Sequence, residues 1–159
     1  MPQPAARART RFVPPDPEYA ARVKSSFDRQ GAMRLIGARI ADLGPGYCAI
    51  ELPFRRDLTQ QHGYIHAGIV SAIADSAGGY AGFTLFPSDS SVLTVEYKIN
   101  LLAPADGDRL VATGRVVKSG RTLTICELAV VAVKNGRTTE CAHGLQTLMC
   151  MQGRPDRAV

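Results

Sequence analysis

Apolar positions recur along this chain with two periods, one typical of helices and one typical of strands. The first apolar stripe has helical spacing, follows Asp16-Pro17 and stops at Gly31, and its members are Tyr19, Ala20, Val23 and Phe27. Residues 35–43 and 47–53 alternate instead, and the Gly-Pro-Gly turn at 44–46 joins them. The pattern predicts a short helix followed by a β-hairpin.

A longer apolar run begins at Ala67 and ends before residues 86–89, which predicts a buried central helix. Its residues are mostly Ala and Gly, which let a helix approach a sheet closely. Gly78 and Gly79 would each cost about 1 kcal/mol in an exposed helix interior, so we expect close packing or a frayed turn there.

Four β-rich runs complete the chain: residues 91–102, 109–118, 122–134 and 139–151. The turns between the last three lie at 119–121 and 135–136, the second being an Asn-Gly hairpin signal. Strands that follow a central helix predict an α+β domain, with one six-stranded antiparallel sheet wrapped around that helix. We expect the domain to span residues 17–152, between a flexible arm at 1–16 and a flexible tail at 153–159.

Composition excludes several classes of function. The net charge of +5 comes mostly from arginines in the two tails, so the body is nearly neutral and nucleic-acid binding is not expected. No apolar run reaches the roughly 20 residues that span a bilayer, because Asp75 interrupts the longest. The four cysteines form no CxxC pair, so we expect no metal site but reduced, packed thiols in a cytoplasmic protein.

Asp75 is the single charged residue in the apolar central helix. Burying a carboxylate costs free energy unless it has a purpose or a partner. The polar turn at residues 60–66 precedes the helix, whose start offers unpaired N–H groups and a partial positive charge. These are two parts of an acyl-transfer site. The structural alternative is a carboxylate capped by Ser76 or Tyr80, or one at a dimer contact.

Three motifs in order resemble a known family: Gln60-x5-His66-Ala67-Gly68-x6-Asp75, the segment TVEYKINLLAPA at 94–105, and KSGRTL at 118–123. The chain resembles the hotdog-fold acyl-CoA thioesterases of the phenylacetate-degradation (PaaI) type, over roughly residues 27–149. The resemblance implies a hotdog fold and a thioester hydrolase. It implies no separate cofactor, because coenzyme A is part of the substrate.

The resemblance also implies roles for individual residues. A backbone N–H at the helix start, from Ala67 where the family has Gly or from Gly68, would hold the thioester oxygen. Asp75 matches the family's acidic residue, and Thr94 matches a Ser or Thr on the next strand. Gln60 would orient water or the leaving thiol, unless its amide only satisfies the loop backbone. His66 would position the site. Coenzyme A would contact the turn formed by Lys118, Ser119, Gly120 and Arg121.

Helix geometry adds a constraint on assembly. Ala67 and Asp75 are eight residues apart, which is about 12 Å along a helix axis. Both groups must come within about 3.5 Å of the reacting atoms. We therefore expect a homodimer with shared active sites, and the resemblance implies a dimer of such dimers, a homotetramer.

The expected function is hydrolysis of an acyl- or aryl-CoA, with Asp75 acting either as general base on water or as nucleophile through an anhydride. The sequence leaves that choice open, and it does not indicate which acyl group is bound. Two other functions remain as alternatives: a non-catalytic acyl-CoA-binding protein that senses its ligand, and a hotdog hydratase or dehydratase.

Overall fold

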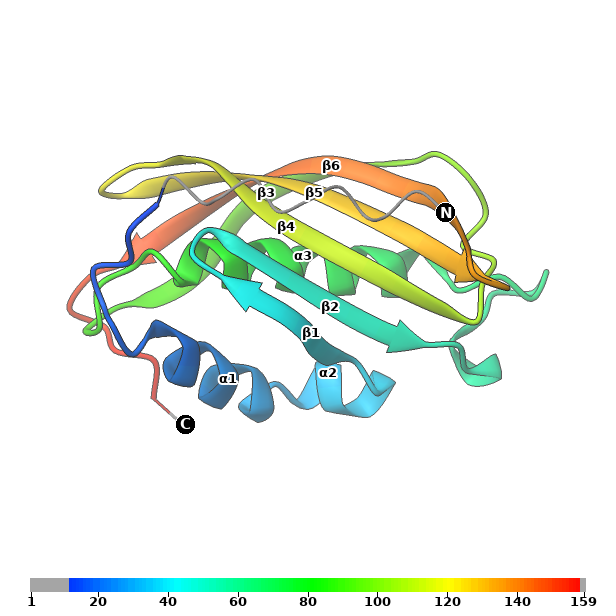
Figure 1. Cartoon of the computed structure of the whole chain (residues 1–159), viewed down its shortest axis with the longest axis horizontal. Coiled ribbons are helices and arrows are strands. Elements are labelled where there is room, and N and C mark those ends of the chain that lie inside the picture. Colours follow the sequence, from blue (N-terminus) through cyan, green and yellow to red (C-terminus); the bar gives the residue numbers. More distant parts are fainter. Residues whose placement is uncertain (1–11, 158–159) are drawn as a thin grey trace.

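A computed structural model describes residues 12–157. Its six strands form one antiparallel sheet in the order β1-β2-β4-β5-β6-β3, and the long helix α3 lies against one face of it (Figure 1). The helices are α1 (Tyr19–Arg29), α2 (Gly31–Ile36) and α3 (Ala67–Phe83), with a 3-10 turn, η1, at Arg56–Leu58. The strands are β1 (Arg39–Gly44), β2 (Tyr47–Pro53), β3 (Ser91–Leu101), β4 (Arg109–Ser119), β5 (Leu123–Lys134) and β6 (Arg137–Met151). This is the hotdog arrangement, and the predicted fold class is confirmed.

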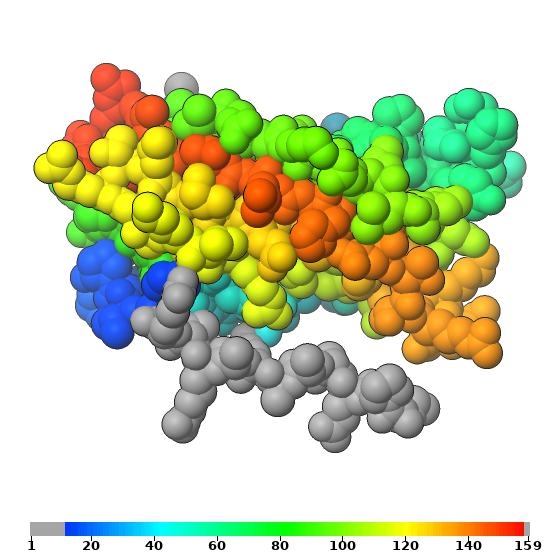
Figure 2. All heavy atoms as spheres, turned by 90° about the horizontal axis from the view of Figure 1, so that it is seen from above, coloured from blue at the N-terminus to red at the C-terminus, as the bar shows by residue number. Residues whose placement is uncertain are grey.

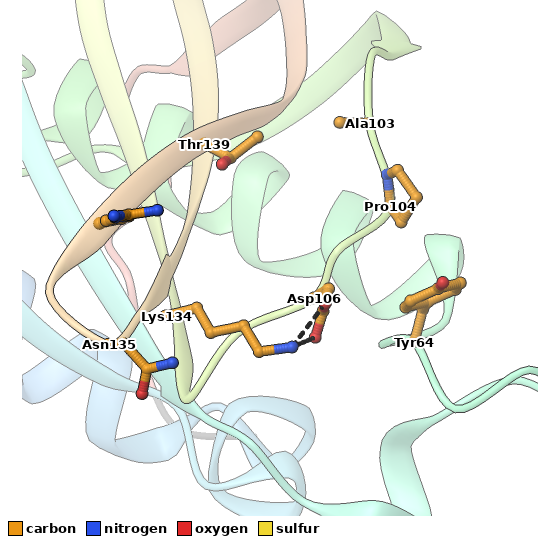
Figure 3. A pocket seen from close by; sticks show the side chains of 8 residues that line it. Tyr64, Ala103, Pro104, Asp106, Lys134, Asn135 and Thr139 are labelled. Carbon is orange, nitrogen blue, oxygen red and sulfur yellow. Dashed lines mark hydrogen bonds and ion pairs between the residues drawn. The ribbon is translucent and has the colours of Figure 1, made fainter.

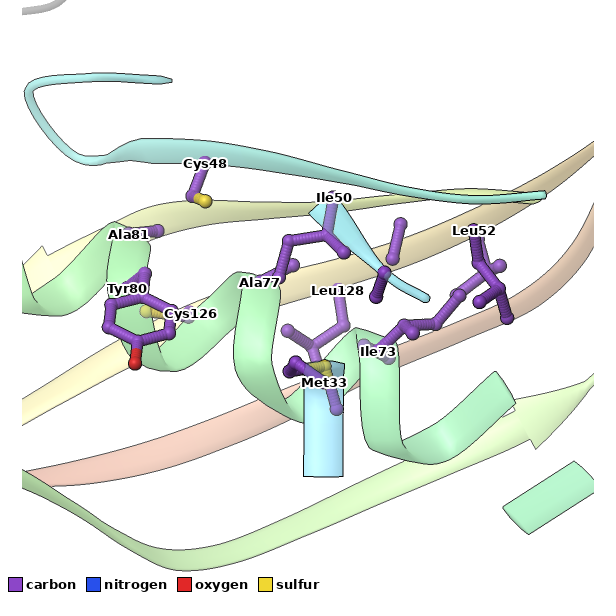
Figure 4. Close-up of a cluster of buried hydrophobic side chains, with 14 of the residues drawn as sticks. Met33, Cys48, Ile50, Leu52, Ile73, Ala77, Tyr80, Ala81, Cys126 and Leu128 are labelled. Atoms are coloured by element: carbon purple, nitrogen blue, oxygen red, sulfur yellow. The ribbon is translucent and has the colours of Figure 1, made fainter. Parts of the chain in front are cut away.

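Small residues on α3 bring the helix backbone close to the sheet. Figure 4 shows Ile73, Ala77 and Ala81 of α3 facing three buried side chains of β2, those of Cys48, Ile50 and Leu52. On β4, a Cβ added to Gly114 would lie 2.4 Å from the Ala77 carbonyl oxygen, so only glycine fits at this crossing. The expectation that Ala and Gly permit close packing is confirmed here.

The region before β1 differs from the prediction. Gly31 does not close the first helix but begins α2, and the predicted strand at 35–43 starts only at Arg39. Met33 and Ile36 are buried at helical spacing, whereas Leu35 is 76% exposed, so helical burial wins over the apparent alternation. Gly37 then ends α2 in the left-handed conformation, with φ of +79°.

Arg22 of α1 fixes the end of α3. Its guanidinium donates hydrogen bonds to the carbonyl oxygens of Phe86 and Pro87, both at 2.7 Å, and lies 4.2 Å from the centre of the Phe83 ring. Arg22 Nε also lies 3.0 Å from Asp16 Oδ2, as an ion pair without hydrogen-bond alignment. A cation at the carbonyl end of a helix stabilises that end. Arg22 therefore holds α1 against the C-terminus of α3.

Contacts of the domain extend past the expected bounds of 17–152. Asp16 is buried and accepts the Glu18 N–H at 2.9 Å, just before the first helix begins at Tyr19. Asp156 pairs with Arg29 at 2.6 Å. Most of the expected arm, residues 1–11, lies outside the described residues.

The two edge strands of the sheet are β1 and β3, and β3 carries exposed apolar side chains. Leu93, Val95 and Tyr97 are 55%, 51% and 43% exposed. Figure 2 shows β3 (green) along one margin of the outer face, beside β6 (orange). The four cysteines are free and buried. Within residues 12–157 no helix is long and apolar enough to cross a membrane.

Candidate active site

The Asp75 carboxylate is held on one of its two oxygens. Asp75 lies in the middle of α3, where it is partly exposed between buried neighbours. Thr94 Oγ1 of β3 donates a hydrogen bond to Asp75 Oδ1 at 2.8 Å, and Gln146 Nε2 of β6 donates to the same oxygen at 2.6 Å. Within residues 12–157, Asp75 Oδ2 has no hydrogen-bond partner. The predicted neighbours Asp75 and Thr94 are therefore brought together, with one carboxylate oxygen free.

Gln146 was not anticipated from the sequence. It is 1% exposed, and its neighbours at the same face of β6 are the buried Gly144 and Leu148. A polar residue at an inward-facing position of an otherwise apolar strand was the available signal. The contact joins positions 71 residues apart, so no local motif reveals it.

A small cavity of about 100 Å³ opens beside Asp75. Besides Asp75 and Thr94 its walls are formed by Gln30, Ser76, Gly79, Tyr80 and Val92. Gln30 was not predicted from the sequence either. It reaches this cavity because its backbone is extended between α1 and α2. Its Oε1 lies 3.4 Å from Ser76 Oγ. Ser76 and Tyr80 make no hydrogen bond to the Asp75 carboxylate, so the alternative that they cap it is wrong.

Tyr80 stays a neutral phenol in this environment. Burial raises the pKa of Tyr80 to about 12, since desolvation penalises the phenolate. Its Oη lies 3.3 Å from Ser26 Oγ, and its ring packs edge-on against Phe27 with centroids 5.6 Å apart. The cavity wall next to Asp75 thus combines apolar surface with neutral hydrogen-bonding groups.

At the start of α3, one backbone N–H is capped and its neighbour is free. His66 is the N-cap, with extended backbone at φ −61° and ψ 138°, and its Nδ1 accepts the Gly68 N–H at 2.9 Å. The Ile69 and Val70 N–H groups bond the His66 carbonyl oxygen. Within the described part of the chain the Ala67 N–H has no acceptor. Of the two predicted donors, Ala67 is the one available to a ligand.

Gln60 lies in the turn before the helix, beside a hollow of about 410 Å³. Its side-chain Oε1 accepts the His62 N–H, so part of the amide satisfies loop backbone, while Nε2 has no partner within residues 12–157. The same hollow is lined by Ala67 and Val70 of α3 and, on the opposite wall, by residues 101–105 and Cys141. Gln60 and Ala67 are therefore brought together as predicted.

A second, outer hollow of about 630 Å³ adjoins the first, with which it shares Tyr64, Ala103 and Pro104. Figure 3 shows Lys134 reaching across it to Asp106, and the Lys134 Nζ lies 2.7 and 2.8 Å from the two carboxylate oxygens. This ion pair raises the pKa of Lys134. Arg137 also lines this hollow, so two cations lie near the start of α3.

The two halves of the predicted site lie apart within one chain. The cavity at Asp75 and the hollow at Ala67 share no residue, and eight residues of helix separate them by about 12 Å. Thr94, which holds Asp75, belongs to the edge strand β3. Within the described residues no strand pairs with the outer side of β3, so the carboxylate lies behind an open sheet edge.

The predicted coenzyme A turn is far from the helix start of the same chain. Lys118, Ser119, Gly120 and Arg121 form the exposed β4–β5 hairpin, closed by the Gly120 N–H donating to the Leu123 carbonyl oxygen at 2.9 Å. Near this end of the sheet, Gly82 at the C-terminus of α3 meets Leu148 and Thr124. The hairpin lies about 36 Å from the opposite end of β5, at roughly 3.3 Å per residue. The structure does not bring these residues together with Ala67 in one chain.

Comparison with known proteins decides the family. Residues 62–139 match the family model described as Thioesterase superfamily. A thioesterase family protein from Silicibacter pomeroyi, known from its crystal structure, is 47% identical with a TM-score of 0.84, over 85% of this chain and 99% of that one. The chain belongs to the thioesterase superfamily. It is accordingly a thioester hydrolase, as the resemblance implied.

Two less similar proteins share features with this thioesterase. The E. coli PaaI protein of the phenylacetic acid degradation operon shares its fold, with a TM-score of 0.77 at 18% identity over 87% of this chain and 96% of that one. A 1,4-dihydroxy-2-naphthoyl-CoA hydrolase from Listeria monocytogenes is 23% identical over 100 residues, which are 63% of this chain and 81% of that protein. The predicted PaaI-type hotdog thioesterase is confirmed at the level of family and fold.

Proposed function

We propose that this thioesterase hydrolyses acyl-CoA at a site to which two copies of the chain contribute. The observation that carries the proposal is the Asp75 carboxylate, which is anchored through Oδ1 by Thr94 and Gln146 and keeps Oδ2 unpartnered beside an open cavity within the described residues. A carboxylate held in this way can accept a proton or attack a carbonyl carbon.

The developing negative charge would be stabilised at the start of α3. The thioester carbonyl oxygen accepts the free Ala67 N–H, where the helix dipole also favours an anion. His66 positions this turn by capping Gly68, which leaves the neighbouring N–H for the substrate. Gln60 Nε2 is directed to water or to the leaving sulfur from the same hollow.

Asp75 would drive hydrolysis by one of two balanced routes. As general base it removes a proton from water while the water oxygen bonds the carbonyl carbon; the C–S bond then breaks, and the thiolate of coenzyme A takes that proton. As nucleophile it forms a mixed anhydride as the thiolate leaves; water then cleaves the anhydride, which restores the Asp75 carboxylate and releases the acid, and one proton of the water passes to the thiolate. Single-turnover reaction in ¹⁸O water separates the routes if label appears in the Asp75 carboxylate.

The second subunit follows from the separation of the two halves. Thr94 and the exposed Leu93, Val95 and Tyr97 lie on β3, an uncovered edge strand with an apolar surface. Such an edge is a template for pairing, and pairing two copies there covers it and carries Asp75 toward the partner's helix start. The exposed side chains of Leu123 and Leu145, on β5 and β6, support the association of two such dimers.

The remaining assignments concern the substrate and the compartment. Coenzyme A enters as part of the substrate, with its phosphates at the Lys118–Arg121 hairpin of the subunit that supplies Asp75. The acyl group faces the cavity of Gln30, Ser76 and Tyr80, whose neutral polar groups suit an aryl or hydroxylated acyl chain. Four free, buried thiols support a cytoplasmic location.

The test is release of free thiol from a panel of acyl-CoA thioesters. We expect turnover with the wild-type protein, and a 10²–10⁴-fold lower kcat for Asp75→Asn, as loss of a general base typically gives. Asp89→Asn, which changes an exposed carboxylate in the loop before β3, is the matched control and should leave the rate unchanged.

Two other results would replace the proposal. Tight binding of acyl-CoA without thiol release would indicate the sensing protein, and hydration of an enoyl-CoA would indicate the hydratase. The occupied imidazole of His66, which caps Gly68, favours hydrolysis over a reaction that needs an Asp/His proton-transfer pair.

A further inference from the structure

Gln146 makes an unusual set of contacts for a core residue. Its Nε2 lies 2.6 Å from Asp75 Oδ1, 3.1 Å from the Asp75 carbonyl oxygen and 3.1 Å from Thr94 Oγ1. Thr94 gives its own hydrogen to Asp75 Oδ1. The amide, the hydroxyl and the carboxylate therefore form a closed triangle in which both neutral groups donate to the same carboxylate oxygen.

The other end of the Gln146 amide is left without a partner. Gln146 Oε1 is buried and accepts no hydrogen bond within residues 12–157. Rotating the amide by half a turn would not help, because Oε1 would then face Asp75 Oδ1 at the present 2.6 Å and two acceptors would repel. The orientation is thus fixed by the carboxylate.

Gly78 makes room for this unsatisfied oxygen. A Cβ at position 78 would lie 1.9 Å from Gln146 Oε1, so any larger residue displaces the amide. An unsatisfied buried oxygen destabilises a fold, and an apolar side chain of the same shape would avoid that cost. An apolar residue would also remove the hydrogen bond to Asp75, so the glutamine is explained by the carboxylate that it holds.

We infer that Gln146 is a positioning residue, which with Thr94 fixes the rotation of the Asp75 carboxylate so that Oδ2 is the reacting oxygen. The torsion that turns an aspartate carboxylate has broad minima and needs outside contacts to define it. A misplacement of about 1 Å can cost on the order of 10²-fold in rate. This inference rests on the proposed function, because it names how Asp75 is aimed.

Gln146→Met tests the inference, since methionine has nearly the same shape and length but no donor. We expect kcat to fall at least about tenfold with KM within twofold of wild type. The melting temperature should change little, because loss of the hydrogen bond to Asp75 destabilises the fold while removal of the unsatisfied oxygen stabilises it. A loss of kcat together with a large fall in the melting temperature would assign the effect to a disturbed core and overturn the inference. Wild-type kcat in a folded Gln146→Met protein would overturn the inference.

Thr124→Val is the matched control. Thr124 is fully buried on the adjacent strand β5, and its Oγ1 has no partner within the described residues, yet it does not touch Asp75. Its replacement is expected to leave kcat unchanged. An equal loss in Thr124→Val would assign the Gln146 effect to general core disturbance and overturn the inference.

Combination with Asp75→Asn separates this inference from the proposed function. If Gln146 acts through Asp75, Gln146→Met should not lower the residual rate of Asp75→Asn further; an additional tenfold loss would contradict it. A crystal structure of Gln146→Met provides a readout without turnover. The Asp75 carboxylate should rotate or adopt several positions, and an unchanged carboxylate would overturn the inference even if the protein proved not to hydrolyse acyl-CoA.

Discussion

The Asp75 side chain is held by hydrogen bonds rather than by an ion pair. Within residues 12–157 no cation contacts its carboxylate, and two neutral donors, from Thr94 and Gln146, take the place of solvent. A hydrogen bond to an ionised group contributes roughly 1.5–3 kcal/mol, which offsets part of the cost of burial. The two donors hold one carboxylate oxygen and leave the other open, so the surroundings of this residue suit chemistry as well as stability.

At the same scale, the cations of the β4–β5 hairpin give a prediction about substrate binding. Neither Lys118 nor Arg121 has a carboxylate partner within the described residues, so both can meet phosphate. Replacing both with Ala should raise KM for acyl-CoA several-fold with little change in kcat, because binding common to the ground and transition states is removed. A short pantetheine thioester, which lacks the nucleotide, should be unaffected.

The matched control uses the two cations near the start of α3. Lys134 is already paired with Asp106, and with Arg137 it lines the outer hollow. Changing both of these to Ala should leave KM unchanged. If KM responds to Lys134 and Arg137 rather than to the hairpin, the nucleotide lies on the subunit that supplies the helix start.

The individual residues of the site were only partly predictable. Asp75, Gln60 and Ala67 can be recognised from a local pattern. Asp75 is a carboxylate within an apolar helix, Gln60 is an amide in the polar turn before that helix, and Ala67 supplies an N–H at its first turn. Gln146 and Gln30 reach Asp75 and its cavity through contacts between distant segments, and no spacing along the chain encodes them. For Gln146 the strand alternation gave a usable signal. The position of Gln30 could be predicted only with knowledge of the break between α1 and α2.

At the scale of elements, α3 is where composition and packing agree most closely. Its glycines serve different purposes: Gly78 packs against Gln146 and Leu128, whereas a Cβ at Gly79 would meet no atom within 4 Å. Gly79 lines the cavity beside Asp75. The sequence predicted either close packing or a frayed turn for this pair, and the structure gives close packing at one position and open space at the other.

This difference predicts opposite effects for two neighbouring substitutions. Gly78→Ala should destabilise the protein by about 1–3 kcal/mol through overpacking, because its Cβ would lie 1.9 Å from Gln146 Oε1. Gly79→Ala should stabilise it by up to about 1 kcal/mol, since alanine is the better helix former. Denaturant unfolding of both variants at one protein concentration measures this. Equal destabilisation by the two would show that α3 packs differently along this turn.

The N-terminal elements show why local patterns can mislead. Residues 35–43 alternate in the sequence, yet burial of Met33 and Ile36 selects a helical turn before the strand begins at Arg39. Tertiary packing overrides a weak local signal in such cases. The later strands have strong alternation and hairpin turns, and their predicted bounds differ from the observed ones by only one or two residues.

For the whole molecule, the central feature is that one chain holds the two halves of the proposed site apart. The free Ala67 N–H and the free Asp75 Oδ2 occur in different hollows, with an apolar edge strand next to the second. Helix geometry alone predicts that separation, because the rise per residue is fixed. How a partner would complete the proposed site depends on side-chain fit along β3, which no pattern in a single sequence encodes.

The most direct test of the shared site is activity of a mixed dimer made from two inactive variants. One parent carries Asp75→Asn. The other combines Gln60→Ala with Ala67→Pro, which deletes the free N–H at a first helical position where proline fits, since the preceding His66 is already extended. Different affinity tags on the two chains isolate the mixed species. Each parent alone must be inactive yet form the same oligomer.

In such a dimer one site collects both defects and the other site none. The shared-site account predicts up to about half of the wild-type activity per mixed dimer, whereas a site built from one chain predicts none. Verified mixed dimers that hydrolyse acyl-CoA no faster than the inactive parents would contradict the account.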